Sequence, residues 1–296
     1  MWKVPEPLSV LEVCLEDGCV STIRRHGNPD GLRVVMSHGN GLSIDLYSPF
    51  WSLLCDEFDL FLYDLRNHGW NSVGSRLNHN VPTLIHDQRI LLEAIDRQYG
   101  QKPKIGVFHS ISALTTLFSS AQDGSFSALL LFDPPLCKPG NSQVEFDAAA
   151  ERLASRLRLR ARMFRSEQEF VELLHYMPAF TRVVPGVREL VASTTLKESP
   201  DGNGFELRCP PEYEAQLTDY VRGFAVLADL GELACPTKVI GADPTLPSAY
   251  LPTFDMSHIL TVDYDFLPET THLLQLEKPA ECVTSVREFL KGINLP

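Results

Sequence analysis

Short, unbroken apolar segments that alternate with amphipathic helical patterns are the feature of this sequence that most constrains its fold. An apolar run without polar alternation is typical of a strand buried on both faces, as in a parallel sheet covered by helices. The segments of this kind are 33–37, 58–63, 104–108, 127–132, 237–240 and 258–263. Helical periodicity between them is clearest at 83–99 and at 279–291. This alternation predicts an α/β fold with a mostly parallel sheet.

Two regions depart from the alternation. Residues 8–25 alternate apolar and polar side chains on either side of an Asp-Gly turn, which predicts an antiparallel hairpin before the parallel strands. Residues 139–232 are mainly helical and are punctuated by turn-rich segments. We therefore expect an α/β core formed by 1–138 and 233–296. Residues 139–232 should be inserted between two of its strands as a helical cap over a functional site.

Composition restricts the class of protein. The chain has 296 residues, a length at which it can form one large hydrophobic core, and its formal net charge is −12. A surplus of acidic groups opposes binding to a polyanion, so we expect no nucleic-acid partner. No apolar run reaches the roughly 18 residues of a membrane span, and the N-terminus has no apolar segment of the secretory type. The seven cysteines form no metal-binding pattern, so we expect reduced thiols, a cytoplasmic protein and no metal.

The strongest chemical signal is Ser110, at the centre of the sequence Phe108-His109-Ser110-Ile111-Ser112. It stands directly after a predicted strand and directly before a helical segment. A serine on the sharp turn that joins a strand to a helix is held above the carboxyl edge of the sheet, where its hydroxyl can attack a substrate. The turn normally has glycine two residues before and two residues after the serine, because side chains there crowd the neighbouring elements. Phe108 and Ser112 occupy those places, so a simple helix N-cap is the alternative interpretation of Ser110.

Two further segments supply what a nucleophilic serine needs. A glycine-rich turn, 37–41, follows the first predicted parallel strand. We expect the backbone N–H groups of Asn40 and Ile111 to form an oxyanion hole, the alternative being an ordinary turn whose glycines only need positive φ. His272 lies between the last predicted strand and the last predicted helix, downstream of Ser110. This agrees with the chain order serine, acid, histidine.

Taken together, these segments resemble the α/β-hydrolase superfamily, in its capped branch of serine esterases and C–C hydrolases. The resemblance rests on His38–Asn40, Asp64–Asn71, His109–Ser112, Pro236–Asp243 and His272–Pro279. They occur in the family's order and span the chain from about residue 33 to 290. The resemblance implies an eight-stranded, mostly parallel sheet, a helical cap after the sixth strand, and a Ser-His-acid triad that needs no metal or organic cofactor. It also implies a structural role for His68.

The acid of the triad has more than one candidate. Asp243 follows the penultimate predicted strand, where the resemblance places the carboxylate, although it stands one residue nearer the preceding glycine than usual. Asp133 ends an earlier core strand, at a place where family members often have a structural aspartate. Asp265 and Glu269 are closer to His272 in sequence, but closeness in sequence does not ensure contact. We prefer Asp243 because it fits the chain order of the triad.

The resulting hypothesis is a serine hydrolase in which His272 takes the proton of Ser110, Asp243 orients the histidine and water releases the acyl enzyme. A carboxylic ester of a small molecule is the favoured substrate, while thioesters and vinylogous C–C bonds stay open because similar triads cleave them. The rival hypothesis is a hydrolase-fold binding protein that lacks catalysis, which the departures at Phe108 and Ser112 motivate. The sequence sets no oligomeric state.

The predicted cap contains an arginine-rich stretch at 152–165. The spacing of these arginines spreads them around more than one face of a helix. We interpret them as a solvated surface paired with acidic neighbours. The alternative is that they draw a carboxylate-bearing substrate under the cap.

Overall fold

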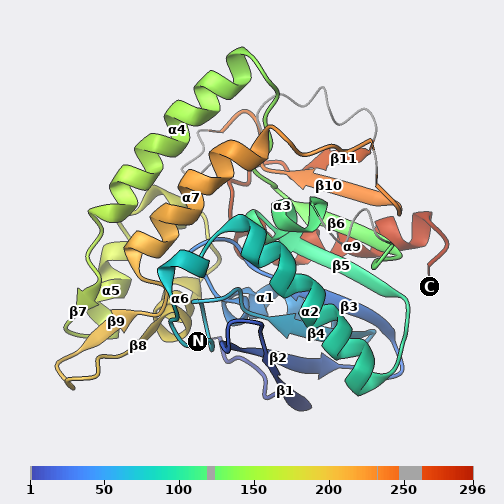
Figure 1. Cartoon of the computed structure of the whole chain (residues 1–296), viewed down its shortest axis with the longest axis horizontal. Coiled ribbons are helices and arrows are strands. Elements are labelled where there is room, and N and C mark those ends of the chain that lie inside the picture. The colour runs from blue at the N-terminus through green and yellow to red at the C-terminus, as the bar shows by residue number, and fades with distance from the viewer. Residues whose placement is uncertain (1, 119–123, 232, 247–261, 296) are drawn as a thin grey trace.

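The computed structural model describes residues 2–118, 124–231, 233–246 and 262–295 of the 296-residue chain. Its main sheet has eight strands. In spatial order they are β1 (Ser9–Cys14), β2 (Val20–Gly27), β4 (Phe58–Tyr63), β3 (Leu32–Ser37), β5 (Lys104–His109), β6 (Ala128–Phe132), β10 (Thr237–Gly241) and β11 (Asp263–Phe266) (Figure 1). Neighbours from β4 to β11 are parallel, whereas β2 is antiparallel to both β1 and β4. The predicted mostly parallel α/β sheet is confirmed.

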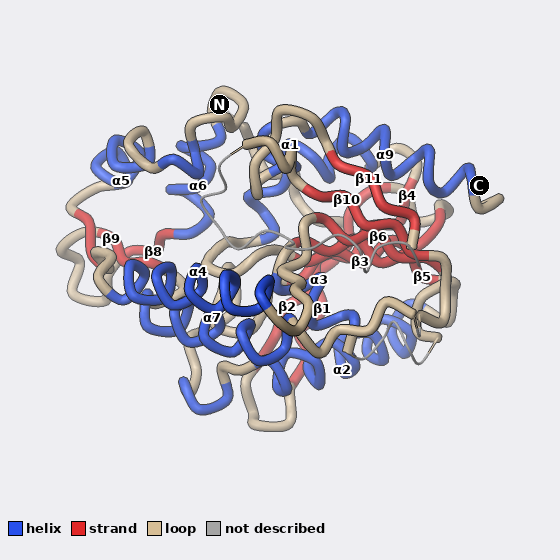
Figure 2. The backbone as a smooth tube through the Cα atoms, turned by 90° about the horizontal axis from the view of Figure 1, so that it is seen from above, coloured by secondary structure: helices blue, strands red, loops and turns tan. Residues whose placement is uncertain are grey.

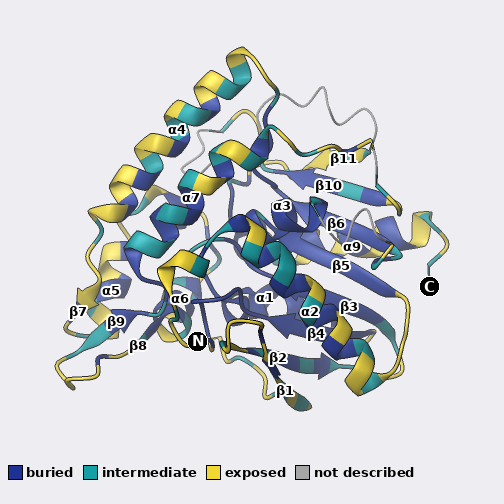
Figure 3. Ribbon diagram, in the orientation of Figure 1, coloured by how far each residue is buried: buried dark blue, intermediate teal, exposed yellow. Residues whose placement is uncertain are grey.

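Helices cover both faces of this sheet, which explains the unbroken apolar strands. Every residue of β4, β5 and β6 is buried (Figure 3). Successive side chains point to opposite faces: Val34 packs into the core beside α9 (Pro279–Gly292), and Val35 into the core beside α2 (Val81–Tyr99) and α3 (Ile111–Leu117). Figure 2 shows α9 and α2 on opposite sides of the strands.

Most of the predicted elements correspond to observed ones. The hairpin expected in 8–25 is formed by β1 and β2, and the helices expected at 83–99 and 279–291 are α2 and α9. The strand expected at 258–263 lies mostly outside the described residues. The edge strand β11 begins at Asp263 and pairs with β10.

Between β6 and β10 the chain forms a second layer of structure, for which we keep the name cap. Its main elements are α4 (Asn141–Arg158), β7 (Met163–Phe164), α5 (Glu167–Leu174), α6 (Val187–Thr195), β8 (Leu196–Glu198), β9 (Phe205–Leu207) and α7 (Pro211–Ala225). The three short strands form a small antiparallel sheet, which the sequence did not predict. Helices α4 and α7 lie side by side (Figures 1 and 2). The cap boundaries at 139 and 232 stay a prediction.

Candidate active site

Ser110 lies on the sharp turn between β5 and α3, at the carboxyl edge of the sheet. Its backbone has φ 54° and ψ −119°, a conformation that residues other than glycine rarely adopt. The turn is held from both sides: the Ser110 N–H donates to the Phe132 carbonyl at 2.9 Å, and the Leu114 N–H donates to the Ser110 carbonyl at 2.9 Å. The strain therefore persists because the sheet and the helix together determine the path of the chain.

The two side chains that replace the usual glycines are accommodated locally. Phe108 is fully buried and packs edge-on against Phe126, with ring centroids 5.6 Å apart. Gly106 provides the space, because a Cβ atom there would lie 2.6 Å from the Phe108 ring. The Ser112 hydroxyl donates to the His109 carbonyl at 2.9 Å and accepts the His109 N–H at 3.1 Å. Neither residue prevents the strained turn from forming.

The structure brings Ser110 and His272 together and adds Asp133 behind them. The Ser110 Oγ lies 2.9 Å from His272 Nε2, and His272 Nδ1 lies 2.5 Å from Asp133 Oδ2. Asp133 is 1% exposed and His272 is 4% exposed, so little water competes for these hydrogen bonds. The other carboxylate oxygen, Oδ1, accepts the Ala242 N–H at 3.2 Å, which fixes the orientation of the Asp133 side chain.

Among the described residues, the preferred acid Asp243 makes no hydrogen bond or ion pair with His272, so the geometry favours Asp133 in that role. The Asp243 carboxylate accepts the Thr245 N–H at 2.9 Å, the Thr245 hydroxyl at 2.6 Å and the Glu269 N–H at 2.8 Å. The hydrogen bond from the Thr245 hydroxyl, with those from the two backbone N–H groups, lowers the pKa of Asp243. This carboxylate therefore orders the loop before His272.

Strand register explains why Asp133 takes the place beside the histidine. In the pairing of β5 with β6, His109 lies opposite Phe132. The next residues along the two strands are Ser110 and Asp133, so both leave the sheet at the same edge on neighbouring strands. Asp243 lies one strand farther away, beyond the end of β10.

Asn40 and Ile111, the predicted oxyanion donors, line the same cavity as Ser110. Ile111 is the first residue of α3, so the helix itself provides no acceptor for its N–H. The Asn40 side chain is held by the cap, because its Nδ2 donates to the Glu214 carbonyl at 2.7 Å. The glycine-rich turn is thus fixed by α7 as well as by the core.

His68 supports the glycine-rich turn through a ring nitrogen. Its Nε2 accepts the Gly41 N–H at 3.0 Å, and its Nδ1–H donates to the Arg66 carbonyl at 2.9 Å. The ring is fully buried, and burial holds the pKa of His68 well below its ordinary value. A neutral imidazole that orients a turn agrees with the structural role implied for this residue.

A buried chain of hydrogen bonds that sequence reasoning missed connects the three loops of the site. The Tyr47 Oη accepts the Gly39 N–H at 3.2 Å and donates to His109 Nδ1 at 2.6 Å. The His109 Nε2–H then donates to the His272 carbonyl at 2.7 Å. Burial, with a smaller effect of the neighbouring His272, holds the pKa of His109 well below its ordinary value, so the ring is neutral.

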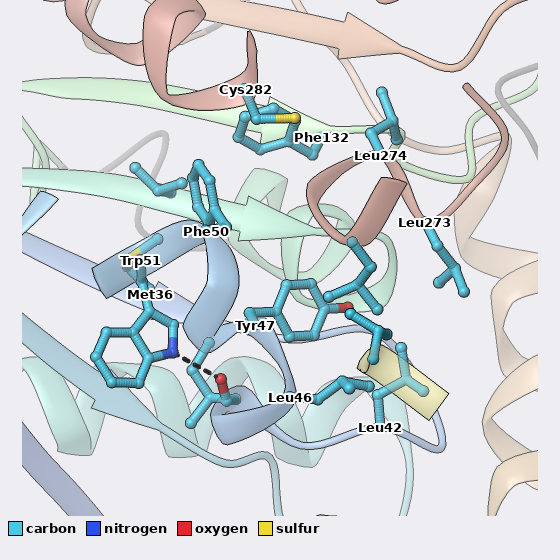
Figure 4. Packing of buried hydrophobic residues seen from close by; sticks show 14 of the residues in the cluster. Met36, Leu42, Leu46, Tyr47, Phe50, Trp51, Phe132, Leu273, Leu274 and Cys282 are labelled. Carbon is cyan, nitrogen blue, oxygen red and sulfur yellow. Dashed lines mark hydrogen bonds between the residues drawn. The ribbon is translucent and has the colours of Figure 1, made fainter. Parts of the chain in front are cut away.

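Tyr47 belongs to the core cluster that also contains Leu273 (Figure 4). One phenol therefore positions two loops, those that follow the paired strands β3 and β5. A histidine directly before the serine is the only sequence signal for this chain of bonds, since Tyr47 lies far upstream of Ser110.

A small cavity of about 40 Å³ lies over Ser110 and His272. Its apolar wall includes Leu42, Ile111 and Pro135 from the core and Leu153, Leu157 and Val221 from the cap. Its polar wall includes Asn40, Glu214 and Thr218. Residues of α4 and α7 therefore form part of the cavity wall.

One cluster among the described residues has the composition of a metal site. Potential ligand atoms of His68, His79 and Cys209, all buried, lie within 4.8 Å of one another. Both nitrogens of His68 are already in hydrogen bonds with the backbone. Burial raises the pKa of the Cys209 thiol well above its ordinary value and lowers the pKa of His79 to about 3. These groups are therefore described best as a neutral, packed cluster.

The chain belongs to the α/β-hydrolase family, whose model matches residues 34–285. No curated protein sequence matches the chain. Among the residues that the structure describes, no helix is both long and apolar enough to cross a membrane.

Solved structures of hydrolases share the fold at low sequence identity. E-2-(acetamidomethylene)succinate hydrolase has a TM-score of 0.79 at 14% identity, covering 96% of this chain and 99% of that one. A malate-bound thermophilic esterase from Thermogutta terrifontis has a TM-score of 0.69 at 20% identity, with the same coverage of 96% and 99%. The thioesterase domain from the curacin biosynthetic pathway has a TM-score of 0.69 at 16% identity, covering 94% and 99%. At these identities the likeness concerns the fold, and the family assignment identifies the chain as a hydrolase.

Proposed function

We propose that this chain is a serine hydrolase that cleaves a carboxylic ester of a small molecule, with Ser110 as nucleophile, His272 as base and Asp133 as acid. The proposal rests on the continuous hydrogen-bonded chain from Ser110 Oγ through His272 to Asp133. The alternative of a helix N-cap is disfavoured, because the Ser110 hydroxyl makes no capping bond to α3.

The proton positions define the first step. Asp133 accepts the proton on Nδ1 of His272, so Nε2 has a free electron pair directed at the Ser110 hydroxyl. His272 takes the hydroxyl proton while Oγ attacks the carbonyl carbon, and Asp133 stabilises the imidazolium. The N–H groups of Asn40 and Ile111 stabilise the oxyanion. The imidazolium then protonates the leaving alcohol as the ester C–O bond breaks.

Water completes the cycle by the same route. His272 takes a proton from a water molecule that attacks the acyl enzyme, and it returns this proton to Ser110 as the acid leaves. The mostly apolar wall and small volume of the cavity favour a short acyl group. A thioester or a vinylogous C–C bond is the second candidate substrate, since it requires the same nucleophile, base and oxyanion donors.

We also propose a cytoplasmic location. All seven cysteines are free thiols in the structure, and Cys14 is exposed. Unpaired thiols are typical of proteins in a reducing compartment.

The test of the nucleophile uses a fluorophosphonate probe, which needs no knowledge of the natural substrate. We expect labelling at Ser110 alone, located by peptide mass spectrometry, and hydrolysis of 4-nitrophenyl acetate. Ser110→Ala should lose both while its melting temperature stays close to that of the wild type. A folded wild-type protein that neither reacts with the probe nor hydrolyses esters or thioesters would support the rival, a binding protein without catalysis.

A further inference from the structure

One residue that lines the cavity over Ser110 has a carboxylate that the proposed mechanism does not use. Among the described residues that line it, Glu214 is the only Asp, Glu, Lys or Arg. Glu214 lies on α7 and is 4% exposed. A Cβ atom on Gly41 would lie 2.5 Å from its Oε1, so the carboxylate is pressed against the glycine-rich turn. The Glu214 carboxylate is therefore held against the turn that contains Asn40, a proposed oxyanion donor.

The cation paired with this carboxylate lies outside the cavity. Arg160 Nη2 lies 2.5 Å from Glu214 Oε2, and Arg160 does not line the cavity. Other arginines of the predicted arginine-rich stretch are paired with acidic neighbours: Arg158 with Asp219, Arg162 with Glu206 and Arg165 with Glu169. The interpretation of these side chains as a paired surface is favoured over capture of a carboxylate.

A second hydrogen-bond acceptor belongs to a residue of the cavity wall and has no donor opposite it in the described part of the chain. Asn40, which also lines the cavity, has a buried Oδ1 with no hydrogen-bond partner among the described residues. Its Nδ2 is engaged by α7, which fixes the direction of the amide. The segments 119–123 and 247–261, which the structure does not describe, contain no Lys or Arg in their sequence. Those segments therefore add no Lys or Arg side chain that could pair with an anionic substrate.

On the basis of the proposed function, we infer that the site selects esters that are neutral around the scissile bond and rejects those with a carboxylate next to it. Removing a carboxylate from water is costly unless a cation or hydrogen-bond donors compensate it. Here the substrate carboxylate would meet the Glu214 carboxylate in a site of reduced dielectric constant. Neutral substrates that donate a hydrogen bond satisfy the same acceptors.

The experiment compares two esters that differ in a single methyl group, dimethyl fumarate and monomethyl fumarate. For each, kcat/KM of the full chain is divided by the rate constant of hydroxide hydrolysis, which removes the difference in intrinsic reactivity. We expect the normalised value to be at least about 10-fold higher for the neutral diester, because a substrate carboxylate near that of Glu214 is repelled in a partly screened site.

Two variants of the cap test the cause. Glu214→Gln keeps the backbone carbonyl that holds Asn40 and frees Arg160. The normalised values of the two esters should therefore become nearly equal in this variant. The matched control is Glu206→Gln, which removes a buried cap carboxylate that pairs with Arg162 and Lys197 but does not line the cavity. It should keep the preference of the wild type. If Glu214→Gln does not fold, Arg160→Gln gives the opposite test, because it leaves Glu214 uncompensated and should widen the preference.

The outcomes separate the two proposals. Equal normalised values for the two esters in the wild type, or a preference that Glu214→Gln leaves unchanged, would overturn the charge selection while hydrolysis still supports the triad. Probe labelling of Ser110 without turnover of dimethyl fumarate would also overturn the inference alone. Absence of both labelling and turnover would overturn the proposed function as well.

Discussion

Replacing Asp133 by asparagine tests the acid assignment through the tautomer of His272. The Ala242 N–H donates to Asp133 Oδ1, so an asparagine would keep its carbonyl oxygen there and present its NH₂ group to His272 Nδ1. The imidazole would then have to accept at Nδ1 and hold its proton on Nε2. In that tautomer it has no electron pair for the Ser110 proton, and Asp133→Asn should be inactive for this reason alone.

The size of the loss follows from the burial of the pair. Both partners are almost completely buried, at 1% and 4% exposure, so no solvent can restore the productive tautomer. We expect kcat to fall by about 10⁴-fold, the loss seen for this change in a serine protease, which corresponds to about 5.5 kcal/mol in activation free energy. The assay is kcat on 4-nitrophenyl acetate, measured beside a thermal melting curve for each variant.

Asp243→Asn is the matched control for the same substitution. It weakens the hydrogen bonds that order the loop before His272, so it should lower the stability of the fold. We expect a lower melting temperature and a kcat within about 10-fold of the wild type. A folded Asp133→Asn variant with near-normal kcat, together with an inactive, folded Asp243→Asn variant, would refute the assignment of Asp133.

Three further predictions concern single histidine and tyrosine side chains. His272→Ala should abolish turnover and keep the fold, whereas His68→Ala should mainly lower the melting temperature; an active His272→Ala variant would exclude His272 as the base. Tyr47→Phe removes the hydroxyl between the glycine-rich turn and the serine turn, so we expect kcat to fall by about 10-fold with KM little changed. An effect confined to KM would contradict this positioning role.

The third of these predictions concerns pH. Burial lowers the pKa of His26 to about 4, below the ordinary value of 6.5, so the unfolded chain binds the proton more tightly than the folded one. The contribution of this neutral histidine to stability is complete above pH 6.5 and is lost as the pH falls from 6.5 toward 4. Urea unfolding at pH 7 and pH 5 should show lower stability at pH 5, and His26→Gln should reduce the difference if the variant is folded.

The sequence by itself determined the elements whose causes are local. Strands buried on both faces need unbroken apolar runs, and such runs placed β3 to β6 and β10 correctly. The strand–serine–helix arrangement located Ser110, and the position of His272 between the last strand and the last helix located its partner. In each case a few neighbouring residues specify the backbone, so no knowledge of distant contacts is needed.

Only the tertiary structure decided which distant groups meet. The choice between Asp133 and Asp243 depends on which strand lies beside β5 and in what register, and neither is encoded near the residues themselves. The tolerance of Phe108 depends on the missing side chain at Gly106, and the link through Tyr47 joins loops from separate parts of the chain. The position of Glu214 against the glycine-rich turn follows from the packing of α7 over the core. These contacts form only when the elements pack together, because hydrogen bonds and close packing require distances that the folded chain alone sets.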